Sequence, residues 1–230
     1  GVTKRITNTP EQERMVSFSP DGKTLLYSSE RGNSWKIFET KKQRSEEPYF
    51  YASTVLNETA IISNSNENYE PSYSPDGKEI AFIENRMTLK VYNVATKQTR
   101  TILTDKELFY MGDNDQYFQW SPDGKWFVYL LDDSGRFRVM LRSVLGNSTK
   151  EIFRTGLKDP LRKETSVSPV VQWAANQDLY ILANQEGKSF LHVFQWTKQN
   201  LKLASKRNLG DIRFLDFELN ANAQRMLVRS

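Results

Sequence analysis

The sequence predicts an all-β protein built from repeats of one four-stranded unit. The pentapeptide Ser-Pro-Asp-Gly-Lys occurs three times, at 19–23, 74–78 and 121–125, and each copy directly follows an aromatic residue. Two further segments, 173–177 and 219–223, take the same place before an apolar run. The anchors lie 55, 47, 53 and 46 residues apart, at positions 18, 73, 120, 173 and 219. A period of about 50 residues is typical of a β-propeller, so we expect about five blade motifs.

Each pentapeptide has the residue types that a tight hairpin turn requires. Proline fixes φ near the value needed early in a type I turn, and aspartate can bond to the backbone that follows it. Glycine accepts the left-handed conformation at the end of the turn. The repeated pentapeptide is therefore interpreted as a folding signal that carries no chemistry of its own.

The residues around each turn supply four strands. The run after the turn is apolar on both faces, for example at 80–83, as expected of a strand sandwiched between neighbouring sheets. A third, alternating strand follows at 35–38, 89–92, 137–140 and 191–194. A more polar outer strand closes each unit, for example at 99–104 and 149–154. Four antiparallel strands make one blade.

Each end of the chain holds an incomplete blade, and the strand at one end is of a kind that the other end lacks. Residues 3–7 match an outer strand without inner strands before it, and the chain stops after the second strand of the fifth unit. Either the N-terminal strand completes the last blade, or residues 1–230 form one propeller domain that is part of a larger propeller. We favour the second arrangement, because an open edge strand invites aggregation.

Composition excludes several classes of function. The longest apolar run, 126–131, has six residues, so we expect no membrane insertion. The chain has no Cys and a single His, which excludes disulfides, thiolate metal sites and the usual catalytic triads. The net charge of +4 comes from mixed signs, so nucleic acid is not an expected partner. We expect neither a cofactor nor a metal.

The ionisable residues that could carry chemistry also have structural explanations. The alignment of the repeats puts His192 in the slot of Lys36, Lys90 and Arg138, which we interpret as an outward position of the third strand. Paired acids at Asp113 and Asp115, and at 132–133, could serve glycoside chemistry or hold calcium. Both pairs lie in expected loops, where Asp is common in turns.

One end of the propeller collects a candidate ligand-binding set. The loops opposite the Pro-Asp-Gly turns bring Arg31, Arg86 and Arg136 from equivalent places in consecutive blades. Three guanidiniums around one channel mouth could receive a carboxylate or another anion. The candidate set is completed by Asp113, Asp115 and Tyr117, and the same end holds Glu13, Arg14, Asn68, Tyr69, Glu70 and Asp132. The competing interpretation is that nearby acids simply pair with these arginines.

Two longer stretches resemble a known family. Residues 6–35, with Ser17-Phe18-Ser19-Pro20-Asp21-Gly22, and residues 112–123 closely resemble the first propeller of tricorn-protease-like serine peptidases, especially bacterial ones. The resemblance covers about the first 140 residues. The Pro-Asp-Gly repeat itself is shared with TolB-like propellers and related WD40-like repeats.

This resemblance implies a modular enzyme in which the propeller filters or docks peptide or protein substrate. The family's downstream PDZ and peptidase domains would be its partners, and the bacterial members imply the periplasm or another exported location, whereas the archaeal type is cytosolic. No position matches the family's catalytic motifs, so no catalytic residue is assigned. Two alternatives stay open: a free-standing TolB-like periplasmic scaffold that binds proteins, and a carbohydrate-active propeller that uses the paired acids.

Overall fold

The structure is a computed structural model with two compact units, Gly1–Lys106 and Glu107–Ser230, which are described separately. The residues described are 3–44, 46–104, 118–133, 136–146, 148–155, 168–185, 187–198, 200–212, 214–220 and 222–230. Within them, the only helix is a short 3-10 turn, η1 (Phe50–Ala52), and no helix is long and apolar enough to span a membrane.

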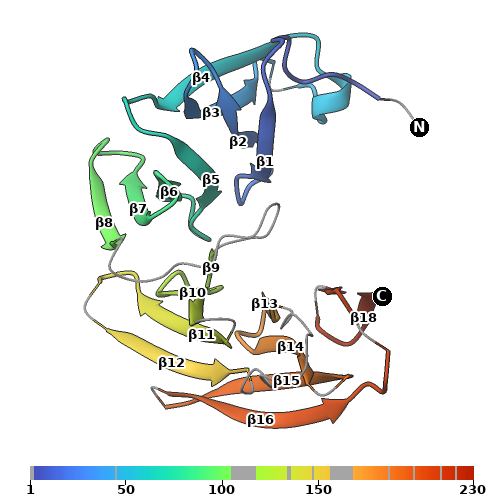
Figure 1. The fold of residues 1–230 in the computed structure, drawn as a ribbon. Helices are drawn as coiled ribbons and strands as arrows, with labels where there is room; N and C mark the ends of the chain where they lie inside the picture. The colour runs from blue at the N-terminus through green and yellow to red at the C-terminus, as the bar shows by residue number, and fades with distance from the viewer. Residues whose placement is uncertain are drawn as a thin grey trace. The chain divides into compact units, whose positions relative to one another are not determined.

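The first unit contains two four-stranded antiparallel sheets, which we call blades 1 and 2 (Figure 1). Blade 1 comprises β1 (Glu13–Phe18), β2 (Thr24–Glu30), β3 (Trp35–Lys42) and β4 (Leu56–Ile62). Blade 2 comprises β5 (Asn68–Tyr73), β6 (Glu79–Glu84), β7 (Thr88–Asn93) and β8 (Thr99–Leu103). The strands of each blade are hydrogen-bonded in chain order, as the repeat predicted.

The second unit contains two more four-stranded sheets and one sheet of two strands. Blade 3 comprises β9 (Phe118–Trp120), β10 (Trp126–Asp133), β11 (Arg136–Ser143) and β12 (Thr149–Arg154). Blade 4 comprises β13 (Val170–Trp173), β14 (Leu179–Gln185), β15 (Lys188–Thr197) and β16 (Asn200–Asn208). Blade 5 comprises β17 (Asp216–Leu219) and β18 (Met226–Arg229). The all-β prediction and all five blade motifs are therefore confirmed.

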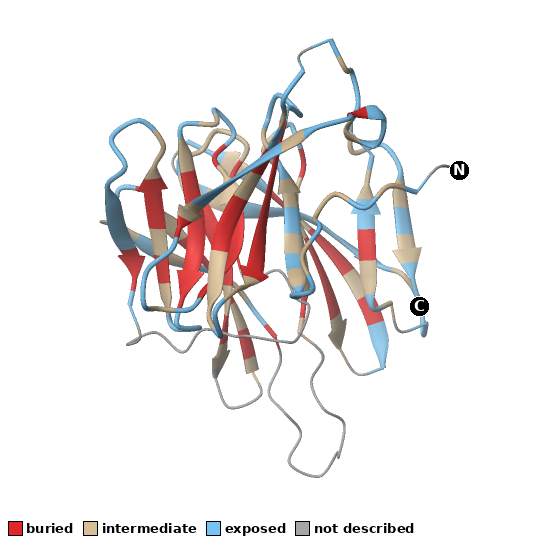
Figure 2. Ribbon diagram, turned by 90° about the horizontal axis from the view of Figure 1, so that it is seen from above, coloured by how far each residue is buried: buried red, intermediate tan, exposed pale blue. Residues whose placement is uncertain are grey.

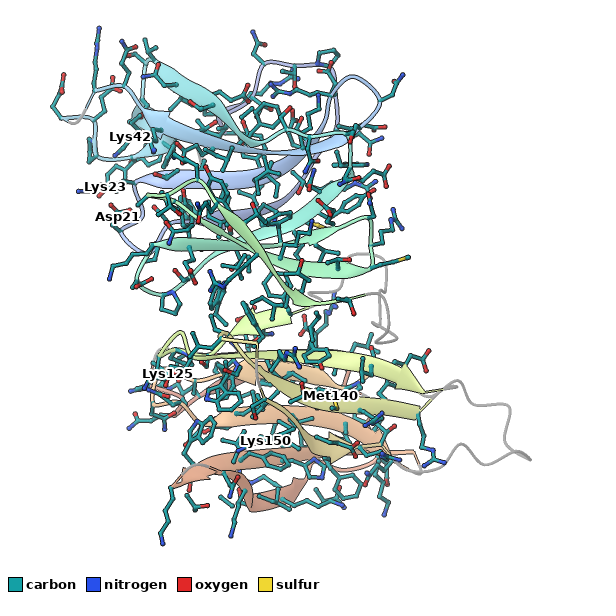
Figure 3. All side chains as sticks on the ribbon, turned by 90° about the vertical axis from the view of Figure 1, so that its left-hand side faces the viewer. Asp21, Lys23, Lys42, Lys125, Met140 and Lys150 are labelled. Carbon is teal, nitrogen blue, oxygen red and sulfur yellow. The ribbon has the colours of Figure 1, made fainter. Side chains whose placement is uncertain are left out.

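The Ser-Pro-Asp-Gly turn is stabilised by a small network of side-chain hydrogen bonds. In blade 2, the Ser74 hydroxyl donates to the Asp76 carboxylate at 2.7 Å and accepts the backbone N–H of Glu79 at 3.0 Å. Gly77 has φ +71° and donates its N–H to the Ser74 carbonyl at 2.8 Å. The same bonds recur in blades 1 and 3, and Figure 3 labels Asp21 and Lys23 at the turn of blade 1.

The two decayed copies also place a left-handed residue in the turn, although neither has glycine there. Gln177 in blade 4 has φ +71° and Ala223 in blade 5 has φ +55°. Their N–H groups donate to the carbonyls of Ala174 and Asn220 at 2.9 and 2.8 Å. These segments therefore hold the place of the turn, although a side chain in the left-handed region is strained.

The core lies between the faces of neighbouring blades (Figure 2). Leu26 and Ile37 of blade 1 pack against Ile80 and Phe82 of blade 2, and all four are at most 1% exposed. A second cluster joins the facing sides of blades 3 and 4, and a third joins blade 4 to blade 5. Burial on both faces explains the continuous apolar sequence of the second strands.

The outer strand predicted over residues 3–7 is wrong. Residues 3–12 form no strand, and no described strand pairs with them. The hydroxyls of Thr7 and Thr9 instead donate to the Glu13 carboxylate at 3.0 and 2.6 Å. Threonine favours a strand only when a partner strand is present to pair with it.

Candidate functional site

Arg31, the first of the three predicted guanidiniums, is bound to an acid of its own blade. Its two terminal nitrogens donate to the Glu58 carboxylate at 2.6 and 2.7 Å, and its Cζ lies 4.0 Å from the centre of the Phe38 ring. This bond lowers the pKa of Glu58 and raises the pKa of Arg31. Arg31 therefore pairs with a nearby acid, as the competing interpretation predicted.

Arg86, the second of the three predicted arginines, lies in the β6–β7 hairpin turn in an unfavourable backbone conformation. Asn85 and Arg86 have φ +50° and +58°, and the N–H of Met87 donates to the Glu84 carbonyl at 3.1 Å. Two consecutive positive φ values define a type I′ turn, which prefers glycine at the position of Arg86. The arginine side chain is exposed there, and its Cζ lies 5.2 Å from the centre of the Tyr69 ring.

Arg86 is one end of a series of contacts that joins blades 1 and 2. The rings of Tyr69 and Trp35 are 5.7 Å apart, and the Cζ of Arg14 lies 5.6 Å from the Trp35 ring. Tyr69 is buried, Trp35 is half-buried, and both arginines are exposed. We call Arg14, Trp35, Tyr69 and Arg86 the arginine–aromatic cluster.

The electrostatics of this cluster follow from its partners. The Tyr69 hydroxyl donates to the Glu67 carboxylate at 2.5 Å. Burial, followed by this bond, raises the pKa of Tyr69, so the phenol stays neutral. Arg14 donates to the neutral amide of Gln12 at 3.0 Å. A guanidinium held by an aromatic ring keeps donors for a carboxylate or a peptide carbonyl.

The remaining predicted site residues are only partly described. Arg136 begins β11 in the second unit and is half-buried. Asp113, Asp115 and Tyr117 lie outside the described residues, so the meeting of all six predicted residues at one channel mouth stays a prediction. Among the described residues, no group of three or more His, Cys, Asp or Glu side chains is arranged to hold a metal.

The outward position predicted for His192 is wrong. The imidazole is 4% exposed and lies between blades 3 and 4, with its ring centre 4.8 Å from Phe153 and 6.4 Å from Phe190. Burial, followed by the charge of Lys206, lowers its pKa. Lysine and arginine in this slot have long stems that reach solvent, whereas imidazole is too short. A neutral ring so enclosed is not placed to serve as a base for a bound substrate.

Sequence reasoning gathered Arg14, Tyr69 and Arg86 at one end of the fold but missed Trp35. The sequence places Trp35 in the expected third strand and at the end of the stretch 6–35 that resembles a known family, but not among the candidate site residues. Its place as the first residue of β3, next to the β2–β3 loop, was the available signal. The pairing of Arg31 with Glu58 was missed as well, because 27 residues separate the two in the sequence.

Comparison with solved structures supports one fold. The periplasmic gluconolactonase PpgL of Pseudomonas aeruginosa is 14% identical at TM-score 0.56, over 93% of this chain and 61% of that one. An oligogalacturonate lyase of Vibrio parahaemolyticus is 10% identical at TM-score 0.55, over 96% of this chain and 72% of that one. TolB of Acinetobacter baumannii is 18% identical at TM-score 0.48, over 79% and 40%. The chain thus spans well under half of that TolB chain.

No protein-family model matches the chain, and no curated protein matches its sequence. The identities to solved structures are low, so these likenesses describe fold alone. Together with the four-stranded antiparallel sheets and the five recurring turns, they show that the chain has a β-propeller fold.

Proposed function

We propose that this chain is a noncatalytic β-propeller module that docks an extended peptide or an unfolded protein segment. The arginine–aromatic cluster carries the proposal. Two exposed guanidiniums lie on a continuous pair of aromatic rings at the junction of blades 1 and 2. Aromatic rings offer a rigid apolar surface, and the guanidiniums add donors for peptide carbonyls and carboxylates.

The conformation of Arg86 supports a role beyond folding. A glycine at this turn position would remove about 1–2 kcal/mol of left-handed strain, yet an arginine is present. Its stacking on Tyr69 offsets part of this cost. Strain of this kind concentrates at binding sites, and it motivates Arg86 as a ligand contact.

The finer proposal is that the docked segment is substrate for a peptidase domain of a longer, tricorn-like exported protein. The resemblance of residues 6–35 to that family motivates this part. The only His is enclosed by aromatic rings and the chain has no Cys, which supports a noncatalytic role for these 230 residues. Arg31 and Arg136 remain proposed contacts of the docked segment. Reading the open reading frame past Ser230 separates this proposal from a free-standing TolB-like scaffold.

Calorimetric titration with peptides of denatured casein tests the docking role. We expect Arg14→Ala, Trp35→Ala and Arg86→Gly each to weaken binding by about 1 kcal/mol, or roughly fivefold. Arg86→Gly is the sharpest variant, because the turn favours glycine and the fold is retained. Arg225→Ala is the matched control, since Arg225 is exposed on the other unit and should leave binding unchanged.

Three results would contradict the proposal. Casein peptides that do not bind, or that bind all variants equally, would remove the cluster as the docking surface. Hydrolysis of casein that survives repurification would refute the noncatalytic role. The solved structures similar in fold include enzymes named for sugar acids, so oligogalacturonate is titrated in parallel. Binding of the sugar without binding of peptide would favour the carbohydrate-active alternative.

A further inference from the structure

The hairpin formed by β15 and β16 concentrates positive charge in blade 4. Residues 188–209 contain no Asp or Glu, and their five cations are Lys188, Lys198, Lys202, Lys206 and Arg207. This segment therefore carries +5, whereas the whole chain carries +4, so the rest of the chain sums to −1. The charge imbalance of the protein is a property of this one hairpin.

In blades 2 and 3, three arginines of the two outermost strands are paired with acids. Arg100 on β8 donates to Glu79 at 2.8 Å, and Arg138 and Arg154 of blade 3 donate to Glu151 at 2.7 and 2.9 Å. Glu79 compensates the charge of Arg100, and Glu151 is shared by Arg138 and Arg154. These three arginines therefore give no indication of a partner.

In blade 4, the described acids compensate little of this charge. Within the described part of the chain, no ion pair involves Lys198, Lys202 or Arg207, and the Nζ of Lys188 approaches Asp211 only to 3.8 Å. These three cations of one hairpin therefore have no acidic partner among the residues that the structure describes. A surface with uncompensated charge of one sign attracts a partner of the opposite sign.

The backbone of β16 offers a second mode of recognition. This strand has nine residues, and among the described strands it pairs only with β15 (Figure 1). Every residue of β16 is exposed except Leu201, which is half-buried. Its outer edge therefore presents backbone donors and acceptors that another strand can pair with.

The charges flank this edge on both faces of the sheet. Lys206 lies opposite His192 in the register, and its Nζ is 4.1 Å from the centre of the Phe190 ring. Arg207 is the next residue, so its side chain points to the opposite face. An added strand would thus meet a cation on each face. Leu203, 52% exposed, lies between the cations and offers an apolar contact.

We propose that the free edge of β16 docks an extended, acidic segment of a partner protein by strand addition. Backbone hydrogen bonds to the edge would hold the segment, and its carboxylates would face Lys202 and Arg207. Neither Arg14 nor Arg86 takes part, so this surface is distinct from the arginine–aromatic cluster, and its test does not depend on that cluster.

Lysines on an edge strand can also serve only to prevent edge-to-edge aggregation. A guard of that kind needs charge but no partner. The two roles differ in what they predict: a docking edge binds an acidic strand in preference to a basic one, and its amides become protected, whereas a guarding edge does neither.

The test is a titration of the whole chain with a synthetic peptide of alternating glutamate and valine. We expect binding at about 0.05 M salt that weakens at about 0.3 M, where charges are screened more strongly. The triple variant Lys198→Gln, Lys202→Gln, Arg207→Gln should lose about tenfold in affinity. Hydrogen exchange of the β16 amides in the wild type should slow on binding.

A matched control removes the same charge elsewhere. The triple variant Lys23→Gln, Lys78→Gln, Lys125→Gln also lowers the net charge by three, at exposed turn positions in three other blades. It should bind the acidic peptide as the wild type does. A peptide of alternating lysine and valine is the control for charge sign and should not bind.

Several outcomes would overturn the proposal. The acidic peptide would fail to bind, or the two triple variants would lose the same affinity for it, or the peptide would bind without slowing hydrogen exchange of the β16 amides. If the triple variant of Lys198, Lys202 and Arg207 self-associates but binds the peptide as the wild type does, these cations only prevent edge-to-edge aggregation. Tighter binding of DNA or of anionic phospholipid vesicles, lost in the same variant, would replace a protein partner by another class of ligand.

Discussion

Blades 2 and 4 have the same four strands in the same antiparallel order, but they form the hairpin between their first two strands with different residues. Gly77 and Gln177 both have φ +71°, and each donates its N–H to the residue three positions earlier. The blade 4 turn is one residue shorter, since Ala174 bonds to Asp178 whereas Ser74 bonds to Glu79. The left-handed residue is thus required by the hairpin, and glycine is only its least strained occupant.

The two blades also differ where a side chain reaches outward. Lys90 on β7 forms an ion pair with Glu84, whereas His192 in the same slot of β15 is buried between aromatic rings. On the outer strands, Arg100 is paired with Glu79, whereas Lys202 has no ion pair within the described residues. The sheet thus fixes the backbone of each strand, whereas the side chain at an equivalent position can differ from blade to blade.

The largest effect expected is from the glycine of blade 2. Gly77→Val should lower the free energy of unfolding by about 2 kcal/mol, because a β-branched residue is strained at positive φ. The added Cβ itself meets only ordinary contacts, the nearest at 3.7 Å on Pro20, so the loss measures backbone strain. Chemical denaturation checks it, with Gly77→Ala as a milder control. An unchanged stability would show that this turn does not require a left-handed residue.

Much of the fold could be predicted because period and turn chemistry are local signals. The five anchors, the apolar second strands and the outer strand of blade 3, predicted over 149–154, are as the structure has them. The strand predicted over 3–7 failed because strand formation depends on a partner that the segment itself does not reveal.

The candidate site was less predictable, because its contacts join residues far apart in the sequence. Arg14 meets Trp35 across blade 1, and Trp35 meets Tyr69 of blade 2. The repeat alignment showed that Arg31 and Arg86 occupy equivalent loops. It could not show that one is bound by Glu58 and the other rests on a ring.

The next largest effect is a pH dependence of stability that comes from His192 in blade 4. The pKa of His192 is lowered in the folded protein, so the unfolded chain takes up a proton at higher pH than the folded one. Stability should therefore fall as the pH drops below the unfolded value of about 6.5, and level off below the folded pKa.

His192→Phe isolates this contribution, because phenylalanine fits an apolar slot without titrating. The difference in unfolding free energy between wild type and variant, measured from pH 7.5 to 5, should change with pH in favour of the variant. Carboxylates that titrate in the same range cancel in this difference. A difference that stays constant across the range would mean that the imidazole has the same pKa in the folded and unfolded states, and is therefore solvated in the fold.

A smaller and opposite effect is expected from making blade 4 more like blade 2. Gln177→Gly removes the strain of a side chain at φ +71° and adds flexibility to the unfolded chain. The net gain should be about 0.5–1 kcal/mol. Thermal unfolding checks it, with Gln172→Gly as the opposite control, since a glycine inside β13 should destabilise. A loss of stability in Gln177→Gly would mean that its side chain makes compensating contacts.

The smallest effects concern the outer strands, and they distinguish paired from unpaired charge. Arg100→Gln should cost about 0.2–1 kcal/mol, because it breaks a partly exposed, bidentate pair with Glu79. Lys202→Gln should leave stability unchanged within about 0.3 kcal/mol, because no described acid pairs with it. Measured side by side at low and high salt, only the Arg100 loss should shrink as salt is added. If Lys202→Gln lowers the free energy of unfolding as much as Arg100→Gln does, the charge of Lys202 stabilises the fold itself. The cations of this hairpin would then not be available to bind a partner.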